Sequence, residues 1–74
     1  MKHINIIAKS FNINKKDIKE NIKIDKFNWD SLTKIKLISY INEKYSKNID
    51  HRKFEKVTNF KDINNLIEET LKNE

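Results

Sequence analysis

Apolar residues recur at helical spacing in three stretches of this chain, and each stretch predicts an amphipathic helix with one face against a core. In the first, roughly residues 2–10 and the residue that follows, the apolar positions are Ile4, Ile7, Ala8 and Phe11. In the second, from residue 31 to about residue 46, they are Leu37, Ile38, Ile41 and Tyr45. In the third, which opens after the capping candidate Asn59, they are Ile63, Leu66, Ile67 and Leu71.

Two less regular stretches connect these helices. Residues 12–30 form a long interval with scattered apolar anchors, which are Ile13, Ile18, Ile22, Ile24, Phe27 and Trp29. Connections of this length are uncommon in compact domains and are often functional. Residues 50–56 form a short predicted helix or turn, anchored by Phe54 and Val57. We therefore expect residues 1–74 to form one domain with an all-α fold, a small four-helix bundle of three longer helices and one short one.

Two apolar residues of the second helix do not belong to its core-facing stripe. At about 100° per residue, Leu32 and Ile35 point well away from the stripe and close to the direction of Ser39. Single exposed apolar residues are ordinary. A pair beside a candidate site is a weak sign of a docking patch.

The composition excludes several classes of functional site. The chain has 74 residues and no Cys, Gly or Pro, which excludes a disulfide framework, a thiolate metal site, a P-loop and a Rossmann fingerprint. His3 and His51 stand far apart and in no metal-ligand pattern, so no metal site is expected. No apolar run approaches the length of a membrane span, and the first residues do not resemble a signal peptide. We expect a cytoplasmic protein without membrane insertion.

Positive charge is concentrated in the middle of the chain. The net charge is +5, and residues 31–61 hold eight Lys and Arg against three Asp and Glu. Such a stretch can attract nucleic acid or anionic lipid, so a small basic helical module that binds nucleic acid or another partner is the alternative function. The basic residues are interspersed with core positions, however, and a single arginine offers little for reading guanine. We therefore expect no nucleic-acid partner.

Ser31 stands where the second helix begins, and its residue type allows three roles. Serine and aspartate are both preferred N-caps, so either Asp30 or Ser31 is a candidate cap. A nucleophilic serine needs a base within reach, and no histidine is near in sequence, so we expect no catalytic residue and no enzyme activity. As an attachment point, Ser31 would place a phosphate at the positive end of a helix. The residues alone leave the cap and the attachment point open.

The run "WDSLTKIKLISYINEKYSKNI" resembles the acyl carrier protein family. The family signature is Asp-Ser-Leu at the start of the second helix, then spaced aliphatic residues and a closing aromatic. The matching residues here are Asp30, Ser31, Leu32, Ile35, Leu37, Ile38, Ile41 and Tyr45. Upstream, the layout of first helix, long loop and serine also matches, and downstream "FEKVTNFKDINNLI" resembles the short third helix and the start of the fourth. The resemblance thus covers nearly the whole chain.

This resemblance implies that Ser31 carries 4′-phosphopantetheine, added from coenzyme A by a phosphopantetheinyl transferase, with Asp30 beside it at the cofactor site. The thiol of the arm would hold an acyl or aminoacyl group as a thioester, in a chain that has no cysteine of its own. Further implied partners are an acyl- or aminoacyl-loading ligase and a downstream acyltransferase or synthase, which a monomeric carrier meets in turn. The implied docking positions are Leu32, Ile35, Lys36 and Glu43.

The chain departs from the family pattern near the serine and along the second helix. Typical members have glycine two residues before the aspartate, whereas Asn28 and Trp29 precede Asp30 in this chain. The sequence "WDSL" resembles stand-alone carriers of specialised pathways. Positions that are usually acidic read Thr33, Lys36 and Asn42, with only Glu43 kept. We therefore expect partners that dock through apolar contacts and polar or acidic surfaces. The aspartate before the serine favours an acyl carrier over a peptidyl carrier. D-alanyl carriers also have an aspartate at this position, so an aminoacyl cargo is a second possibility.

Overall fold

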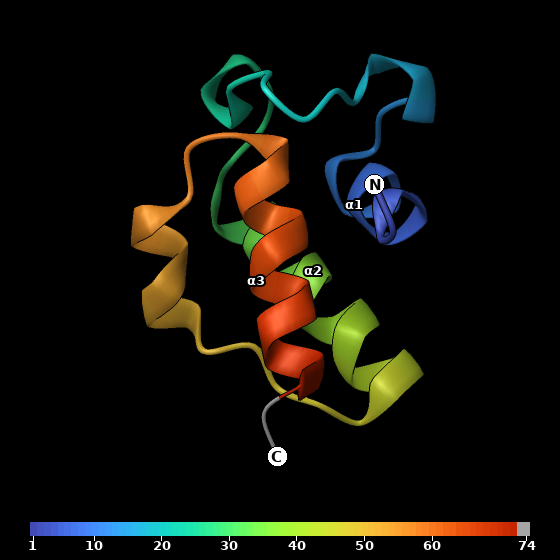
Figure 1. Ribbon diagram of the computed structural model, residues 1–74, viewed down its shortest axis with the longest axis vertical. Helices are drawn as coiled ribbons and strands as arrows, with labels where there is room; N and C mark the ends of the chain where they lie inside the picture. The colour runs from blue at the N-terminus through green and yellow to red at the C-terminus, as the bar shows by residue number, and fades with distance from the viewer. Residues whose placement is uncertain (73–74) are drawn as a thin grey trace.

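The computed structural model describes residues 1–72, which form an all-α bundle (Figure 1). Within that range the three α-helices are α1 (Ile4–Phe11), α2 (Ser31–Tyr45) and α3 (Phe60–Lys72). Three short 3-10 helices accompany them: η1 (Lys15–Asp17), η2 (Ile24–Lys26) and η3 (His51–Lys56). The predicted fold class is confirmed, with η3 as the short helix. The helix bounds differ from the predicted ones by one or two residues.

The core forms where the three apolar stripes meet. Ile7, Leu37, Ile41, Ile63 and Ile67 are fully buried. Ile38, Tyr45 and Leu71 pack against this cluster from its edge and are half-buried. The three predicted stripes therefore do face the core, and the residues at their margins are only partly buried.

Two helices end without glycine, which is the usual residue for a left-handed backbone at this position. Asn12 follows α1 with φ 56°, and its N–H bonds to the carbonyl oxygens of Ala8 and Lys9. Ser46 follows α2 with φ 57°, and its N–H bonds to Asn42. Asparagine tolerates this conformation well, so α1 ends as the composition suggests, while serine is a less common choice.

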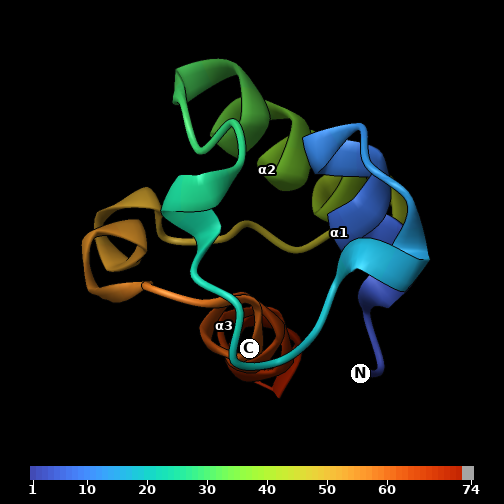
Figure 2. The ribbon, with the colours of Figure 1, turned by 90° about the horizontal axis from the view of Figure 1, so that it is seen from above.

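The connection of residues 12–30 crosses one end of the bundle and is tied down along its length (Figure 2). Ile18 and Ile24 insert into the core. Backbone hydrogen bonds join it to the segment that leads into α3, from the N–H of Ile24 to Thr58 at 3.0 Å and from the N–H of Phe60 to Ile22 at 3.2 Å. The long connection is therefore an ordered layer of the fold that delivers the chain to the start of α2.

The start of α3 has reciprocal caps. The Asn59 side-chain oxygen accepts a hydrogen bond from the Asp62 N–H at 2.9 Å, and the Asp62 carboxylate accepts one from the Asn59 N–H at 3.3 Å. Thr58 donates to the same carboxylate from its backbone and its hydroxyl. These bonds, the Thr58 backbone N–H above all, lower the pKa of Asp62. The predicted cap at Asn59 is confirmed as a capping box.

His3 is a buried polar residue that the sequence did not single out as part of the core. Its backbone N–H donates to the side-chain oxygen of Asn64 at 2.9 Å, and its ring meets Tyr45 edge-on at 6.2 Å. Its Nε2 lies 3.7 Å from the Glu68 carboxylate. Burial lowers the pKa of His3, and Glu68 opposes that shift. His3 thereby links the start of α1 to α2 and α3.

Within residues 1–72, no helix has both the length and the apolar character that crossing a bilayer requires.

Candidate functional site

The start of α2 has one cap, and that cap is Asp30. The Asp30 carboxylate accepts a hydrogen bond from the Thr33 N–H at 2.9 Å, while its backbone oxygen accepts one from the Lys34 N–H at 3.1 Å. Ser31 is the first residue of the helix. The choice between Asp30 and Ser31 as N-cap is thus resolved in favour of Asp30, and the Ser31 hydroxyl is left without a capping role.

Ser31 is exposed on the surface of the bundle. Ser31 is at the first helical position, where the backbone N–H groups have no acceptor within the helix. The positive end of the helix dipole lies at the same place. An external enzyme can therefore reach this oxygen, and negative charge placed on it is favourably located.

The Asp30 carboxylate contributes a fixed negative charge next to Ser31. The hydrogen bond from the Thr33 backbone, followed by the bond from its side chain, lowers the pKa of Asp30. Thr33 itself is only 5% exposed. Although Thr33 corresponds to a surface position in the resembled family, here it supports the cap from inside and is not available for docking.

Aromatic packing holds the residues just before Ser31. The Trp29 indole stacks on Phe11 of α1, with ring centroids 5.5 Å apart and planes 9° apart. Its edge meets Phe54 of η3 at 5.3 Å. The Lys34 ammonium lies 5.2 Å from the centre of the Trp29 ring. The sequence indicated Trp29 as an apolar anchor and as part of the WDSL motif, and in the structure it also ties the start of α2 to two other elements.

A groove opens beside Ser31 between α2 and η3. Its volume is about 460 Å³, and its lining consists of Ser31, Lys34, Ile35, Ile38, His51, Phe54 and Glu55. The lining combines the aliphatic Ile35 and Ile38 and the aromatic Phe54 with polar and charged side chains. The sequence could not point to His51 or Glu55, because they reach Ser31 only through the packing of η3 beside α2.

His51 raises the question of a serine–histidine pair, since both residues line this groove. A nucleophilic serine is activated by a hydrogen bond to its base, and the base is oriented by a third group. The hydrogen bonds found in residues 1–72 do not join Ser31 to His51. The neighbouring Asp50 is committed elsewhere, because it caps η3 and bonds to Arg52. The geometry does not assemble an activated nucleophile.

The single arginine is engaged within the chain. Arg52 makes two side-chain hydrogen bonds of 3.0 Å to the Asp50 carboxylate, one from Nε and one from a terminal nitrogen. These bonds lower the pKa of Asp50 to about 2 and raise that of Arg52. One hydrogen-bonding edge of the guanidinium, formed by Nε and a terminal nitrogen, is therefore occupied by Asp50, which leaves the single arginine less of its edge for bidentate recognition of a base or phosphate.

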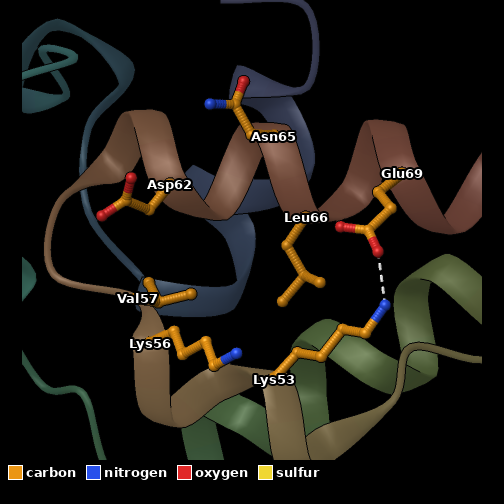
Figure 3. A pocket seen from close by; sticks show the side chains of 7 residues that line it. All are labelled: Lys53, Lys56, Val57, Asp62, Asn65, Leu66 and Glu69. Carbon is orange, nitrogen blue, oxygen red and sulfur yellow. Dashed lines mark hydrogen bonds and ion pairs between the residues drawn. The ribbon is translucent and has the colours of Figure 1, made fainter.

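A second groove, of about 450 Å³, lies between η3 and α3 (Figure 3). Of its charged side chains, Glu69 pairs with Lys53 and Asp62 belongs to the cap of α3, while Lys56 is in none of the ion pairs found in residues 1–72. Figure 3 shows Leu66 extending from α3 into the space between Asp62 and the Lys53–Glu69 pair. This groove shares no lining residue with the groove at Ser31, and we assign no chemistry to it. No cluster of metal-ligating side chains is found in the part of the chain that the structure describes.

The outer face of α2, defined here as Leu32, Ile35, Lys36, Ser39 and Glu43, begins one residue after Ser31. Leu32 is 60% exposed and Ile35 59% exposed, the two large hydrophobic residues that residues 1–72 leave on the surface. Lys36 is half-exposed, and Ser39 and Glu43 are exposed. The prediction that Leu32 and Ile35 lie outside the core is confirmed. The structure brings all the predicted site residues, from Asp30 to Glu43, onto one helix and its cap.

Comparison with known proteins found no relative of this chain. Neither models of protein families nor curated proteins match this chain. Its function is therefore argued from its own residues and from the motif that begins at Asp30.

Proposed function

We propose that this chain is an acyl carrier protein, which holds an acyl or aminoacyl group as a thioester on a 4′-phosphopantetheine arm attached to Ser31. The observation that carries the proposal is the exposed Ser31 at the first position of a helix that Asp30 already caps. An all-α bundle and the motif from Asp30 onward support it. The chain would belong among the stand-alone carriers of fatty-acid or specialised acyl pathways.

The residues around Ser31 fit a phosphodiester. Helix N-termini favour phosphate groups because unpaired N–H groups and the helix dipole both point at them. Lys34 adds a positive charge in the first turn, in the groove that Ser31 also lines. The Asp30 carboxylate already accepts the Thr33 N–H, so its negative charge beside Ser31 opposes part of this attraction.

The proposed modification needs little from the chain itself. The Ser31 oxygen forms a bond to the coenzyme A phosphorus that bears the pantetheine, the bond from that phosphorus to adenosine 3′,5′-bisphosphate breaks, and the serine proton passes to a base on the transferase. The bound arm supplies a thiol for thioester chemistry, in a chain without cysteine. The chain's own part is to present an accessible hydroxyl at a fixed place.

The groove beside Ser31 offers shelter to part of the arm or to a short cargo. Ile35, Ile38 and Phe54 contribute apolar side chains to its lining, whereas Leu37 and Ile41 are fully buried in the core. In this proposal the chain is a cytoplasmic monomer. It meets a phosphopantetheinyl transferase, then a loading ligase, then an acyltransferase or synthase.

The decisive experiment is a mass measurement. Purified protein, shown to be folded by circular dichroism, is incubated with coenzyme A and a broad-specificity phosphopantetheinyl transferase. We expect a gain of one phosphopantetheine in the wild type and none in Ser31→Ala. Ser39→Ala is the matched control, because Ser39 is also exposed on α2, and it should gain the arm. A folded wild type that gains no mass would refute the proposal.

A variant of His51 tests the alternative that Ser31 is a catalytic nucleophile. If Ser31 only receives the arm, then His51→Ala should be modified as fast as the wild type, because the base belongs to the transferase. An acyl-enzyme formed on Ser31 from an activated ester, and lost in His51→Ala, would instead indicate a hydrolase.

A further inference from the structure

The carboxylates close to Ser31 are unfavourable for a phosphate unless a cation offsets them. Asp30 directly precedes Ser31, and its carboxylate is held at the start of α2 by the 2.9 Å hydrogen bond from the Thr33 N–H. Hydrogen bonds from Thr33 lower the pKa of Asp30, so this carboxylate is charged at neutral pH. Glu55 adds a second carboxylate to the lining of the groove beside Ser31. A phosphodiester on Ser31 therefore needs a positive charge close by.

Lys34 is the cation that the fold places there. It stands three residues after Ser31 on α2, so the two side chains are neighbours on the helix surface. Both side chains line the same groove. Lys34 is half-buried, and it takes part in none of the ion pairs found in residues 1–72. Its positive charge is therefore not neutralised by one of the carboxylates in that range.

Trp29 holds the Lys34 ammonium in place. The ammonium lies 5.2 Å from the centre of the Trp29 ring, which is within the range of a cation–π interaction, and tryptophan is the best aromatic partner for a cation. The indole is itself fixed, because it stacks on Phe11 at 5.5 Å and meets Phe54 edge-on at 5.3 Å. A long and flexible lysine side chain is thus restrained before a ligand arrives, which reduces the entropy that binding costs.

Two other lysines lie over aromatic rings, but neither is placed at Ser31. Lys9 lies 4.5 Å from the centre of the Tyr40 ring, and Lys44 lies 5.5 Å from the centre of the Tyr45 ring. Among residues 1–72, Lys34 alone combines a ring contact with a place in the groove that Ser31 lines.

We propose that Trp29 and Lys34 form a preorganised cation site for the phosphodiester on Ser31, in which the indole holds the ammonium and the ammonium offsets the charge of Asp30. This inference rests on the proposed function and names two residues that position the arm at that site. Trp29 and Lys34 are positioning residues, because the arm is bonded to neither of them. Attachment of the arm draws the ammonium toward the phosphate and so changes the surroundings of the indole.

The test compares each protein before and after arm attachment, so that the direct effect of a substitution on the fold cancels. The variants are Lys34→Gln, Trp29→Phe and Trp29→Leu. The matched control is Lys44→Gln, which removes another ring-bound lysine of α2 that lies outside the groove. Each protein is modified with coenzyme A and the broad-specificity transferase, and mass spectrometry verifies complete modification.

Two measurements are made on each pair of forms. Urea unfolding followed by circular dichroism gives the midpoint with and without the arm. Trp29 is the single tryptophan of the chain, so the fluorescence emission of the folded protein reports on the contact between Trp29 and Lys34.

We expect the arm to leave the urea midpoint of the wild type unchanged or higher and to lower the midpoint of Lys34→Gln, because the phosphate then meets Asp30 without a cation. Lys44→Gln should respond as the wild type does. Trp29→Phe keeps a weaker ring and should respond less adversely than Trp29→Leu. The emission should change on attachment in the wild type and change much less in Lys34→Gln. Added salt should shrink the difference in midpoint between these two proteins.

Four outcomes would overturn the inference. In the first, the arm shifts the midpoints of the wild type and Lys34→Gln alike, which would give Lys34 no part at the phosphate. In the second, Lys44→Gln responds as Lys34→Gln does, which would reduce the effect to net charge. In the third, a folded Trp29→Leu responds as the wild type does, which would mean that the ring is not needed.

The fourth outcome decides the ring contact even if Trp29→Leu does not fold: emission of the wild type that does not change on attachment would show that Lys34 does not respond to the phosphate. A wild type that gains no arm would instead refute the proposed function itself, so the two failures are distinguishable.

Discussion

His3 is held in a protein interior where its neutral form is favoured. His3 is 4% exposed, its ring packs against Tyr45, and within residues 1–72 its buried Nε2 has no hydrogen-bond partner. Burial lowers the pKa of His3, and the Glu68 carboxylate 3.7 Å away works in the opposite direction. The lysines that face it, Lys2 and Lys44, add to the lowering. Desolvation of the charged ring therefore exceeds the attraction of Glu68.

This residue predicts a loss of stability on mild acidification. The folded pKa lies below the ordinary value of 6.5, so the unfolded chain binds the proton more readily. His3's contribution is complete above that value and declines as the pH falls through it. Urea unfolding at neutral pH and near pH 5 should show a larger loss of unfolding free energy for the wild type than for His3→Gln. A smaller loss in the wild type would mean that the Glu68 ion pair prevails.

At the scale of elements, the start of α2 is held by a cap and by an aromatic contact. Asp30 satisfies the Thr33 N–H, and Trp29 packs between Phe11 and Phe54. Neither contact involves Ser31. The helix start is therefore independent of the Ser31 hydroxyl, so a bulky group attached there would leave the fold intact.

The cap leads to a prediction about helix stability. Asp30→Ala removes the acceptor of the Thr33 N–H and should lower the urea midpoint, whereas Asp30→Asn keeps an acceptor and should lower it less. Ser31→Ala should leave the midpoint near that of the wild type. Asp17→Ala is the control, since Asp17 is exposed in η1.

The pH adds a second check on the same cap. The pKa of Asp30 is lowered by its hydrogen bonds to Thr33, so the cap's contribution is present above the ordinary carboxyl pKa and is lost as the pH falls through the lowered value. The difference between the wild type and Asp30→Ala should shrink in acid. Equal midpoints for Ser31→Ala and Asp30→Ala at neutral pH would contradict the assignment of the cap.

Local pattern was sufficient to predict the elements but not the contacts between them. Periodicity and residue type act over a few positions of the chain. They were enough to predict the apolar stripes at Ile7, Ile41 and Ile67, the cap at Asn59 and the exposure of Leu32. Periodicity also told which side of α2 is unused by the core. These predictions needed no knowledge of the partner elements.

Other features depend on which segments meet after folding. Serine and aspartate are equally good caps, so only the observed bond to Thr33 distinguished Asp30 from Ser31. The burial of His3 needs α2 and α3, and the placement of His51 beside Ser31 needs η3. A single sequence contains no signal for such distant pairs.

At the scale of the molecule, one side of α2 supports the fold and the other side is left exposed by it. Leu37 and Ile41 are fully buried among the other helices, whereas Leu32 and Ile35 face outward at the end of the helix that bears Ser31. A chain this small has little stability to spare, since domains of its size bury only about 60% of their unfolded surface. Leu32 and Ile35 are the large hydrophobic side chains that it leaves exposed within residues 1–72.

Two isoleucines on α2 make this division measurable with one chemical change. Ile41→Ala leaves a cavity in the core, because Ile41 is 0% exposed, and should cost about 2–5 kcal/mol of unfolding free energy. Ile35→Ala trims a side chain that is 59% exposed and should stay within about 0.5 kcal/mol of the wild type. Urea unfolding measures both. In the proposed carrier, arm transfer should respond the other way: Ile35→Ala slows it, and Ile41→Ala, where still folded, does not. Equal stability losses at the two positions would mean that the outward face also supports the fold.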